Sequence, residues 1–460
     1  MSAGRPALGG RRVLVAGAGA SGEAAVRALL ALGALVTVAD RVASARTERL
    51  AAAGADVRPG LAAPPAGTAL VVTSPGWRPD SPLLRAALAA GIEVIGEVEL
   101  AWRLQADRAV PAWLCLTGTN GKTTTVRMLE SILRAAGHRA VATGNVGLPV
   151  IDAVREDPPY QVLAVELSSY QLYWSGTLAP RAAALLNVAE DHLDWHGSMA
   201  GYGAAKRRIF HPDAVNVVNA DDPAARRLAD GLPDVIGFTL GEPGPGQLGV
   251  RGGRLVDRAF GPSTVLAAVA EVRPAGPHNV ANALAAAALA RAYEVPAGAV
   301  AEGLRTFVPD RHRNEVVAEV GGVTYVDDSK ATNPHAAAAS LAGYHRVVWI
   351  AGGQLKGAHV DGLLAEHGHR LVGAVLLGTD QATIAGAITR HAPDLPVHRV
   401  ASTDDGAMIE VVRAAAGLAR PGDVVLLAPA AASLDMFASY GARGDAFAAG
   451  VRDLPGRGTA

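Results

Sequence analysis

A chain of 460 residues is too long for one hydrophobic core, and about two to four domains are expected. Half of its residues are apolar, which excludes a disordered protein, and a formal net charge of −1 provides no long-range field for nucleic acid or an anionic membrane. Its single cysteine, Cys115, excludes an intramolecular disulfide, favours a reducing cytoplasm, and lies in an apolar run as a predicted core thiol.

The N-terminal segment, residues 1–106, is predicted to be a Rossmann-like α/β domain. Residues 1–12 lack the apolar segment of a signal peptide. No stretch of the chain has the ~18–20 apolar residues of a membrane span, so a soluble, cytoplasmic protein without membrane insertion is expected. Apolar runs that alternate with helical stretches indicate parallel strands at 12–16, 35–39 and 69–73.

A glycine-rich turn, Gly17-x-Gly19-x-x-Gly22, follows the first of these strands, and Asp40 follows the second. This spacing matches the dinucleotide-binding fingerprint and, taken alone, predicts NAD. The same turn can hold any diphosphate at a helix N-terminus, or can serve only the close packing of strand and helix. The turn therefore leaves these three interpretations open.

The central segment, residues 107–309, contains a shortened phosphate-binding loop, Gly-Thr-Asn-Gly-Lys-Thr-Thr, between a predicted strand at 113–117 and a helix at 123–136. Its glycines let backbone N–H groups surround phosphate oxygens. Lys122 can neutralise the β- and γ-phosphates, and the Thr123 hydroxyl can ligate Mg²⁺. This pattern predicts an ATP site made of Gly118, Thr119, Asn120, Gly121, Lys122, Thr123 and Thr124.

Two further strand ends of the central segment carry acid and imidazole groups. Glu166 follows the apolar run 162–165, where a carboxylate near a phosphate loop can hold Mg²⁺. His192 lies among acidic residues after the run 182–186, and we predict a functional role for it rather than a purely structural one. Another strand is expected at 215–218, and the Gly/Pro-rich stretch 241–249 is expected to be an exposed loop or hairpin.

The C-terminal segment, residues 310–460, is predicted to be another α/β domain. Its expected strands are 323–326, 347–351, 374–377 and 424–428. Polar loops follow three of them, at 327–333, 352–357 and 429–435. They suggest one shared pocket, although 327–333 alone could be a capped helix entry.

These motifs together resemble the Mur ligases, the ATP-dependent amino-acid-adding enzymes of peptidoglycan synthesis, over essentially the whole chain. The loop at 118–124 is common to the superfamily. The sequence Asp-Asp-Ser-Lys-Ala-Thr-Asn at 327–333 looks like that of the members that add D-glutamate to UDP-N-acetylmuramoyl-L-alanine, and the motifs at 166–172, 191–194 and 429–435 indicate the same members. The resemblance implies three consecutive α/β domains, an N-terminal Rossmann-like, a central P-loop ATPase-like and a C-terminal Rossmann-like domain, and a monomer is expected.

The resemblance implies that ATP and Mg²⁺ activate a carboxylate as an acyl phosphate, which the D-glutamate amine then attacks. Residues implied at the UDP substrate are Gly19, Ser21, Gly22, Asp40, Arg41, Ser74, Pro75, Gly76, Asn145 and Ser168. ATP would further contact Asn279, Arg313 and Asp328. D-Glutamate would contact Lys330, Thr332, Lys356, Ser433, Leu434 and Tyr440. The implied metal ligands are Thr123, Glu166, His192 and Lys206, which is carbamylated in this family, and the implied catalytic groups are Lys122, His192 and Lys206.

Three positions depart from the commoner family pattern: His359, where Asp is frequent, Asn314, where an aromatic residue is frequent, and Tyr440, where Phe is frequent. They bear on the shape of the amino-acid pocket. The alternatives to this interpretation are a ligase of the same superfamily with another acceptor such as a folate, a nicotinamide-dependent oxidoreductase, and a nucleotide-sensing protein without turnover.

Overall fold

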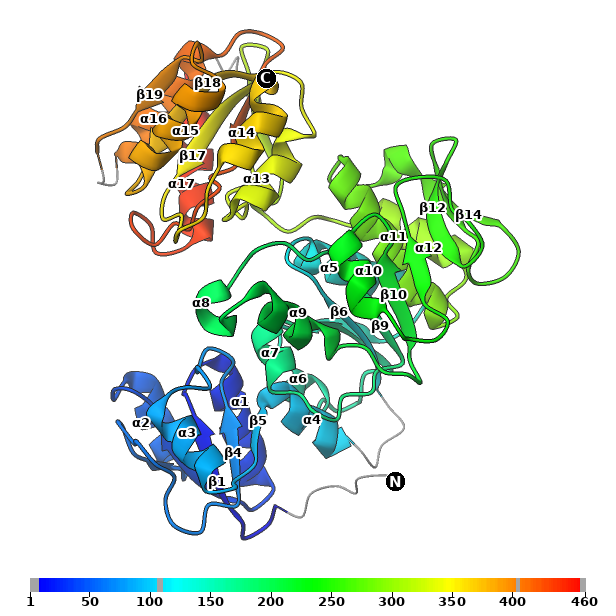
Figure 1. The fold of residues 1–460 in the computed structure, drawn as a ribbon, viewed down its shortest axis with the longest axis vertical. Coiled ribbons are helices and arrows are strands. Elements are labelled where there is room, and N and C mark those ends of the chain that lie inside the picture. Colours follow the sequence, from blue (N-terminus) through cyan, green and yellow to red (C-terminus); the bar gives the residue numbers. More distant parts are fainter. Residues whose placement is uncertain (1–7, 106–110, 403–405, 456–460) are drawn as a thin grey trace. The chain divides into compact units, whose positions relative to one another are not determined.

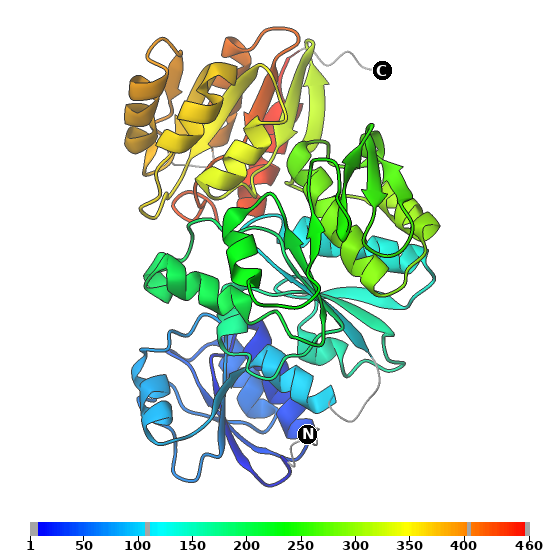
Figure 2. The ribbon, with the colours of Figure 1, turned by 45° about the vertical axis from the view of Figure 1, so that its right-hand side comes forward.

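The computed structural model describes residues 8–105, 111–402 and 406–455, whose helices and strands build three sheets (Figures 1 and 2). The chain divides into two compact units. The first runs to Glu271 and includes Ala281–Phe307, and the second comprises Val272–Val280 and the chain from Val308 onward. The first two sheets belong to the first unit, and the third sheet belongs to the second.

The first sheet has five parallel strands in the order β3-β2-β1-β4-β5. They are β1 (Arg12–Ala16), β2 (Leu35–Ala39), β3 (Asp56–Val57), β4 (Leu70–Thr73) and β5 (Val94–Gly96). The helices are α1 (Ala20–Ala31), α2 (Ala45–Ala52), α3 (Pro82–Ala89) and α4 (Glu97–Gln105). Chain order reverses between β1 and β4, and open α/β sheets bind ligands at such a point, beyond the carboxyl ends of the strands.

The second sheet has nine strands in the order β14-β13-β12-β11-β10-β9-β6-β8-β7, parallel from β7 to β12 and antiparallel from β12 to β14. They are β6 (Ala112–Thr117), β7 (Ala140–Gly144), β8 (Val162–Glu166), β9 (Ala182–Leu185), β10 (Val215–Asn219), β11 (Ile236–Phe238), β12 (Gln247–Arg251), β13 (Arg254–Asp257) and β14 (Thr264–Ala268). The helices are α5 (Lys122–Ala135), α6 (Val150–Ala153), α7 (Ser169–Tyr173), α8 (Leu193–His196), α9 (Met199–Arg207), α10 (Pro223–Ala229), α11 (Pro277–Ala292) and α12 (Ala297–Thr306).

Helix α4 connects the first sheet to the second by apolar packing and by two buried carboxylates. One apolar cluster extends from α1 and α4 to α6 and β6. Within it, Glu97 accepts a hydrogen bond from the N–H of Ile151 at 2.7 Å. Glu99 accepts from the N–H groups of Gly176 and Thr177 at 2.9 and 3.0 Å. Because buried carboxylates need such donors, α4 has one position relative to both sheets.

The third sheet has six strands in the order β15-β16-β20-β17-β18-β19, parallel except for the β15–β16 hairpin. They are β15 (Glu315–Val320), β16 (Val323–Asp327), β17 (Val347–Gly352), β18 (Leu371–Leu377), β19 (Val397–Arg399) and β20 (Val424–Leu427). Helices α13 (Pro334–Leu341), α14 (Asp361–His367) and α15 (Gln381–His391) cover one face. Helices α16 (Ala407–Leu418) and α17 (Tyr440–Arg452) cover the other.

The predicted α/β class and the predicted strands are confirmed, with shifts of a few residues at their ends, whereas nine strands were missed: β3, β5, β7, β11, β12, β13, β14, β15 and β19. All three residues of β19 are exposed, so no apolar run marks it. The stretch 241–249 is only partly an exposed loop, because β12 begins at Gln247 and Leu248 is fully buried. Cys115 is buried as predicted, and burial raises the pKa of its thiol.

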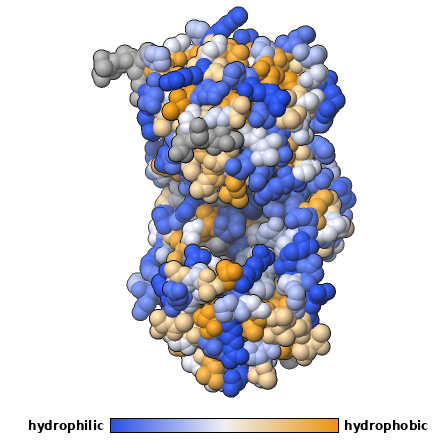
Figure 3. All heavy atoms as spheres, turned by 90° about the vertical axis from the view of Figure 1, so that its left-hand side faces the viewer, coloured by the Kyte–Doolittle hydropathy of each residue, from blue (hydrophilic) through white to orange (hydrophobic). Residues whose placement is uncertain are grey.

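On the face shown in Figure 3, hydrophilic side chains are spread over the surface with apolar ones between them. Among the described helices, none is long and apolar enough to cross a membrane.

Glu97 predicts a pH dependence of stability. Burial raises the pKa of its carboxyl to about 7 from an ordinary 4.5. The folded state therefore holds this proton more tightly than the unfolded state, and the unfolding free energy should fall as pH rises from 4.5 to 7. Urea unfolding across this range should show a smaller decline for Glu97→Gln than for the wild type. Glu48→Gln, on the exposed side of α2, is the matched control, and an equal decline in both variants contradicts the prediction.

Candidate active site

The phosphate-binding loop joins the end of β6 to the start of α5. Gly121 precedes the helix with φ 81°, a left-handed conformation that favours glycine. The N–H groups of Thr119 and Asn120 donate to Asn187 Oδ1 at 3.0 and 2.8 Å. The Lys122 ammonium group folds back on the loop and donates to the carbonyl oxygens of Gly118 and Thr119 at 2.9 and 2.8 Å. The loop therefore holds its lysine at the N-terminus of α5, where an anion is favoured.

A buried carboxylate lies next to this loop at the end of β8. Glu166 is 1% exposed, and its Oε2 accepts from the Thr123 hydroxyl at 2.8 Å. Its Oε1 accepts from the Asn145 side-chain amide at 2.9 Å. The structure thus brings Thr123, Asn145 and Glu166 together from three segments. Their hard oxygen atoms are the kind of ligand that Mg²⁺ prefers.

Lys206 lies on the other side of the loop, on α9, with 1% of its surface exposed. Its Nζ donates to the Gly118 carbonyl at 2.7 Å, so Lys122 and Lys206 share one acceptor. Burial and, second, the charge of Lys122 place the pKa of Lys206 well below its ordinary value. The Tyr202 ring lies 4.6 Å from Nζ. The lowered pKa favours the uncharged form of the amine, which is the form that can act as a nucleophile.

His192 lies beside this group, immediately before α8. It has φ 54°, and its ring centroid is 4.8 Å from that of Tyr170. Partial burial lowers the pKa of its imidazole. A neutral imidazole is a metal ligand and a hydrogen-bonding group rather than a cation.

The first sheet gathers its predicted residues at the β1/β4 switch point. Asp40, after β2, accepts from the N–H groups of Ala18 and Arg41 at 2.8 and 2.7 Å. The Ser74 hydroxyl, after β4, donates to the Gly17 carbonyl at 3.2 Å. A Cβ at Gly22 would lie 1.8 Å from the Gly17 carbonyl oxygen, so this position requires glycine.

The remaining residues implied at the UDP substrate are distributed over both sheets of the first unit. Gly19 and Ser21 begin α1, and Pro75 and Gly76 continue the turn from Ser74. Ser168 lies in the second sheet, where its hydroxyl accepts from the N–H of Gln171 as the cap of α7.

Thr124, from the ATP loop, is buried in the first turn of α5.

In the third sheet, strand order makes the predicted loops neighbours. The loops at 327–333, 429–435 and 352–357 follow β16, β20 and β17, which are adjacent in that order. Gln354 and Ala432 exchange backbone hydrogen bonds at 2.9 Å, and the N–H of Ala430 donates to the Ala331 carbonyl at 2.9 Å. Three separate sequence motifs therefore form one surface.

The ATP candidates Arg313 and Asn279 belong to the second unit, as does Asp328, which is half-buried after β16. Burial raises the pKa of its carboxyl to about 6. It accepts hydrogen bonds from the Ser340 hydroxyl and from the N–H of Asn314. Asn279 is 3% exposed and donates to the Ala275 carbonyl at 3.4 Å.

The D-glutamate candidates are partly exposed at this edge. Lys330 Nζ lies 3.9 Å from the centre of the Tyr440 ring, which is the aromatic neighbour of this cation. The N–H of Thr332 donates to the Lys330 carbonyl at 2.8 Å. Ser433 is 4% exposed and Leu434 is 64% exposed. Lys356 lies on an exposed turn with φ 53°.

The other two departures from the family pattern have different surroundings. Asn314 accepts from the Tyr344 hydroxyl at 2.7 Å, so a polar contact occupies the position where an aromatic ring is frequent. His359 is exposed on the loop after β17.

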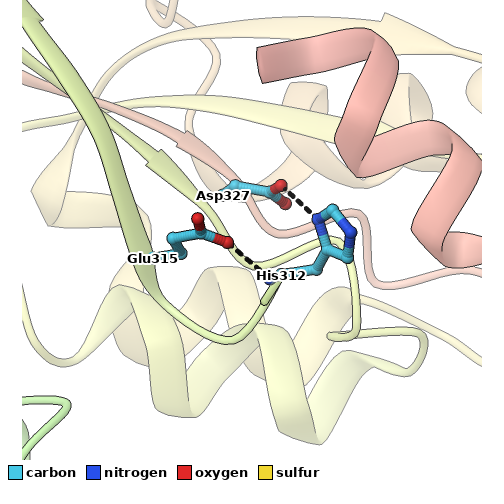
Figure 4. Close-up of side chains that lie close together, drawn as sticks. All are labelled: His312, Glu315 and Asp327. Atoms are coloured by element: carbon cyan, nitrogen blue, oxygen red, sulfur yellow. Dashed lines mark hydrogen bonds and ion pairs between the residues drawn. The ribbon is translucent and has the colours of Figure 1, made fainter. Parts of the chain in front are cut away.

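A further group of potential metal ligands, His312, Glu315 and Asp327, lies at the β15–β16 end of the sheet (Figure 4). Their ligand atoms lie within 4.8 Å of one another. His312 Nδ1 is 2.7 Å from Asp327 Oδ2, and the His312 N–H donates to Glu315 Oε2 at 2.9 Å. These hydrogen bonds hold the turn that contains Arg313, in which His312 and Asn314 have positive φ angles. The cluster therefore has a structural explanation.

Two residues of the ATP region were missed by the sequence prediction. Asn187 holds the loop through two backbone N–H groups, and Tyr202 contacts both Lys206 and the Thr119 hydroxyl, the latter at 3.1 Å. The available signals were weak. Asn187 follows β9 directly, and Tyr202 precedes Lys206 by one helical turn.

Three family domains match this chain in order: "Mur ligase MurD-like, N-terminal domain" at residues 11–96, "Mur ligase middle domain" at 116–290, and "Mur ligase, glutamate ligase domain" at 312–431.

Curated relatives match almost the whole chain. A protein of Thermobifida fusca named UDP-N-acetylmuramoylalanine--D-glutamate ligase is 57% identical over 465 residues, covering 98% of this chain and 100% of the relative. A protein of the same name from Streptomyces avermitilis is 56% identical, covering 97% of this chain and 98% of the relative.

Solved structures share the fold at low identity. UDP-N-acetylmuramate-alanine ligase MurC from Thermotoga maritima has a TM-score of 0.57 and 17% identity, over 96% of this chain and 99% of that one. MurF from Acinetobacter baumannii has a TM-score of 0.58 and 19% identity, over 86% and 88%.

The Thr123–Glu166 contact predicts the effect of removing one hydroxyl. Thr123→Val keeps the side-chain shape but loses the donor to Glu166 and the oxygen available to a cation. A hydrogen bond to a charged group contributes about 1.5–3 kcal/mol, so the Kd for Mg-ATP should rise about tenfold or more. Calorimetric titration measures this, with Thr123→Ser as the control that keeps the hydroxyl. Equal affinity of both variants would show that Thr123 has no part in the nucleotide site.

Proposed function

The chain belongs to the Mur ligase family of ATP-dependent amide-bond-forming ligases, and on that premise we propose that it joins D-glutamate to UDP-N-acetylmuramoyl-L-alanine. The observation that carries this proposal is the use of lysine. The sequence has only four: Lys122, Lys206, Lys330 and Lys356. Two lie beside the phosphate loop, and the other two lie in the third sheet on the loops after β16 and β17, on either side of the loop after β20. The other permanently basic side chains are arginines. The four lysines therefore mark positions where a compact ammonium or a neutral amine is needed rather than a planar guanidinium group.

Each of the three domains would contribute one reactant. We assign residues 1–106 to the UDP end of the acceptor, 107–309 to ATP, and 310–460 to the amino acid. The Gly17–Gly22 turn and Asp40 support a diphosphate and a base or ribose at the first sheet. The relatives' names support the same acceptor and amino acid. We also propose that the protein is a monomer.

Activation requires a carboxylate and the γ-phosphate to meet while their negative charges are offset. Lys122 supports this step through its position at the start of α5, and Thr123, Glu166, His192 and Lys206 offer the groups that would hold Mg²⁺. When bound, Mg²⁺ neutralises charge on the transferring phosphoryl group. Glu166 has the fit expected of such a ligand, since both of its oxygens face hydrogen-bond donors on elements beside the loop. The product is an acyl phosphate.

Bond formation then needs the amine of a dicarboxylate close to the acyl carbon. Lys330 and Lys356 supply two positive charges, and Thr332 and Ser433 supply hydroxyl groups from neighbouring loops. This set suits two carboxylates better than it suits a neutral side chain. The amine attacks the acyl carbon, the C–O bond to phosphate breaks, and phosphate leaves.

Lys206 would be carbamylated in the working enzyme. Two amines at the Gly118 carbonyl are electrostatically unfavourable if both are charged. The uncharged amine of Lys206 can attack CO₂, forming a C–N bond and releasing a proton, and the carbamate that results carries a negative charge. An anionic oxygen beside Lys122 removes the repulsion and gives Mg²⁺ a further ligand.

The amino-acid assignment is tested by phosphate release with ATP, Mg²⁺ and UDP-N-acetylmuramoyl-L-alanine. D-Glutamate should support full turnover, whereas L-glutamate, meso-diaminopimelate and D-alanine should support at most a small fraction of it. Lys122→Ala should lose nearly all turnover, because it removes the ammonium group at the start of α5 that offsets charge on the β- and γ-phosphates. Absence of activity with every amino acid, or full turnover by Lys122→Ala, would overturn these assignments.

The carbamate is tested by ¹³C NMR in ¹³C-bicarbonate. The chain has only four lysine side chains, so few carbamate signals are possible. One signal should persist in the wild type and be absent from Lys206→Ala, and removal of CO₂ should lower activity reversibly. Lys356→Arg, on an exposed turn, should keep the signal. A spectrum that does not change in Lys206→Ala contradicts carbamylation.

A further inference from the structure

Beneath the loops of the third sheet lies a buried arginine that is distinct from the predicted ligand contacts. Arg443 belongs to the first turn of α17 and is 1% exposed. Its Nε and Nη2 donate to the side-chain and main-chain oxygens of Ser329 at 3.0 and 2.9 Å. Its Nη1 donates to the carbonyls of Ala431 and Gly352 at 3.1 and 3.3 Å. One guanidinium group therefore joins the loops after β16, β20 and β17.

Each of these contacts is close in sequence to a residue of the predicted amino-acid pocket. Ser329 precedes Lys330, Ala431 lies two residues before Ser433, and Gly352 ends the strand that leads to Lys356. Ser329 also donates through its hydroxyl to the Tyr440 carbonyl at 2.7 Å.

The loop after β18 is attached to the same assembly through side chains. Asp435 Oδ2 accepts from the N–H of Thr379 at 2.8 Å, and Asp380 Oδ2 accepts from the N–H of Leu355 at 2.7 Å. The four loops at this edge thus hold one another in place.

Burial of a cation has a cost that its surroundings must offset. Burial lowers the pKa of Arg443 to about 10, and the nearest opposing charges are those of Asp435 and Asp327. Its acceptors are carbonyl and hydroxyl oxygens on separate loops, arranged around the planar fork of the guanidinium group. A lysine ammonium has three donors on one atom and cannot reach the same set of oxygens.

We propose that Arg443 is the positioning residue of the amino-acid pocket, which sets the relative placement of Lys330, Lys356 and Ser433 and hence the preference for one enantiomer of the amino acid. This inference rests on the proposed function. Arg443 has no contact with substrate in this role; it acts through the three loops that it joins. Displacement of a reacting group by about 1 Å can lower a rate by ~10²-fold, so a small shift among these loops is sufficient.

The test compares Arg443→Lys with Arg452→Lys, which changes an exposed arginine in the last turn of the same helix. In Arg443→Lys the KM for D-glutamate should rise at least ~10-fold, while the KM values for ATP and the UDP substrate stay within about twofold. The ratio of kcat/KM for D-glutamate over L-glutamate should fall by a similar factor. Arg452→Lys should match the wild type in all of these constants.

A second variant keeps the inference testable if Arg443→Lys folds poorly. Ser329→Ala removes one acceptor and leaves the three carbonyl acceptors intact, so it should raise the KM for D-glutamate in the same direction by a smaller factor. Melting temperatures of both variants identify a purely structural effect. The inference is overturned if the KM for D-glutamate and the enantiomer ratio stay unchanged, or if all substrates weaken equally with the loss of stability. If the wild type uses another amino acid, the proposed function fails, and the same comparison is made with that amino acid.

Discussion

Parallel strands end at the same edge of a sheet, and each sheet of this protein uses that edge to bring together side chains that are far apart in the sequence. In the first sheet it places Asp40 and Ser74 beside the turn at Gly17. In the second sheet it places Glu166 against Thr123. The apolar strands take no part in the chemistry themselves. Their burial in the sheet determines where the polar residues that follow them lie.

At the second sheet, this arrangement brings two lysine side chains close together. Lys122 and Lys206 donate to one carbonyl oxygen, and the pKa of Lys206 is lowered by its burial and, second, by the charge of Lys122. Such a site is suited to anions, which explains why a phosphate, a carboxylate and a carbamate can be considered at one place. Tyr202 contributes an apolar wall to Lys206 and a hydroxyl to Thr119, so it links the helix to the loop.

Buried, hydrogen-bonded side chains fix the positions of the sheets and of the loops that carry the candidate sites. Helix α4 holds the first two sheets together through Glu97 and Glu99, each of which accepts backbone N–H groups across the boundary. In the third sheet the equivalent support is a cation, Arg443, whose acceptors are loop oxygens. In both cases a buried polar group keeps its hydrogen-bond partners in only one arrangement, because movement would leave it without them.

Local sequence patterns were sufficient to predict the fold class, the family and the strands that bear the candidate sites. The loop at 118–124, the apolar runs and the motif at 327–333 each depend on neighbouring residues, and they predicted the α/β class, the ATP-dependent ligase family and the strands that bear the candidate sites. The tertiary structure alone decided the strand order β16-β20-β17, which makes the loops at 327–333, 429–435 and 352–357 neighbours. It also decided the burial of Arg443 and its hydrogen bonds to three separate loops, which no signal in its sequence neighbours indicates. Burial and long-range hydrogen bonds arise only when segments distant along the chain meet, and no local pattern records them.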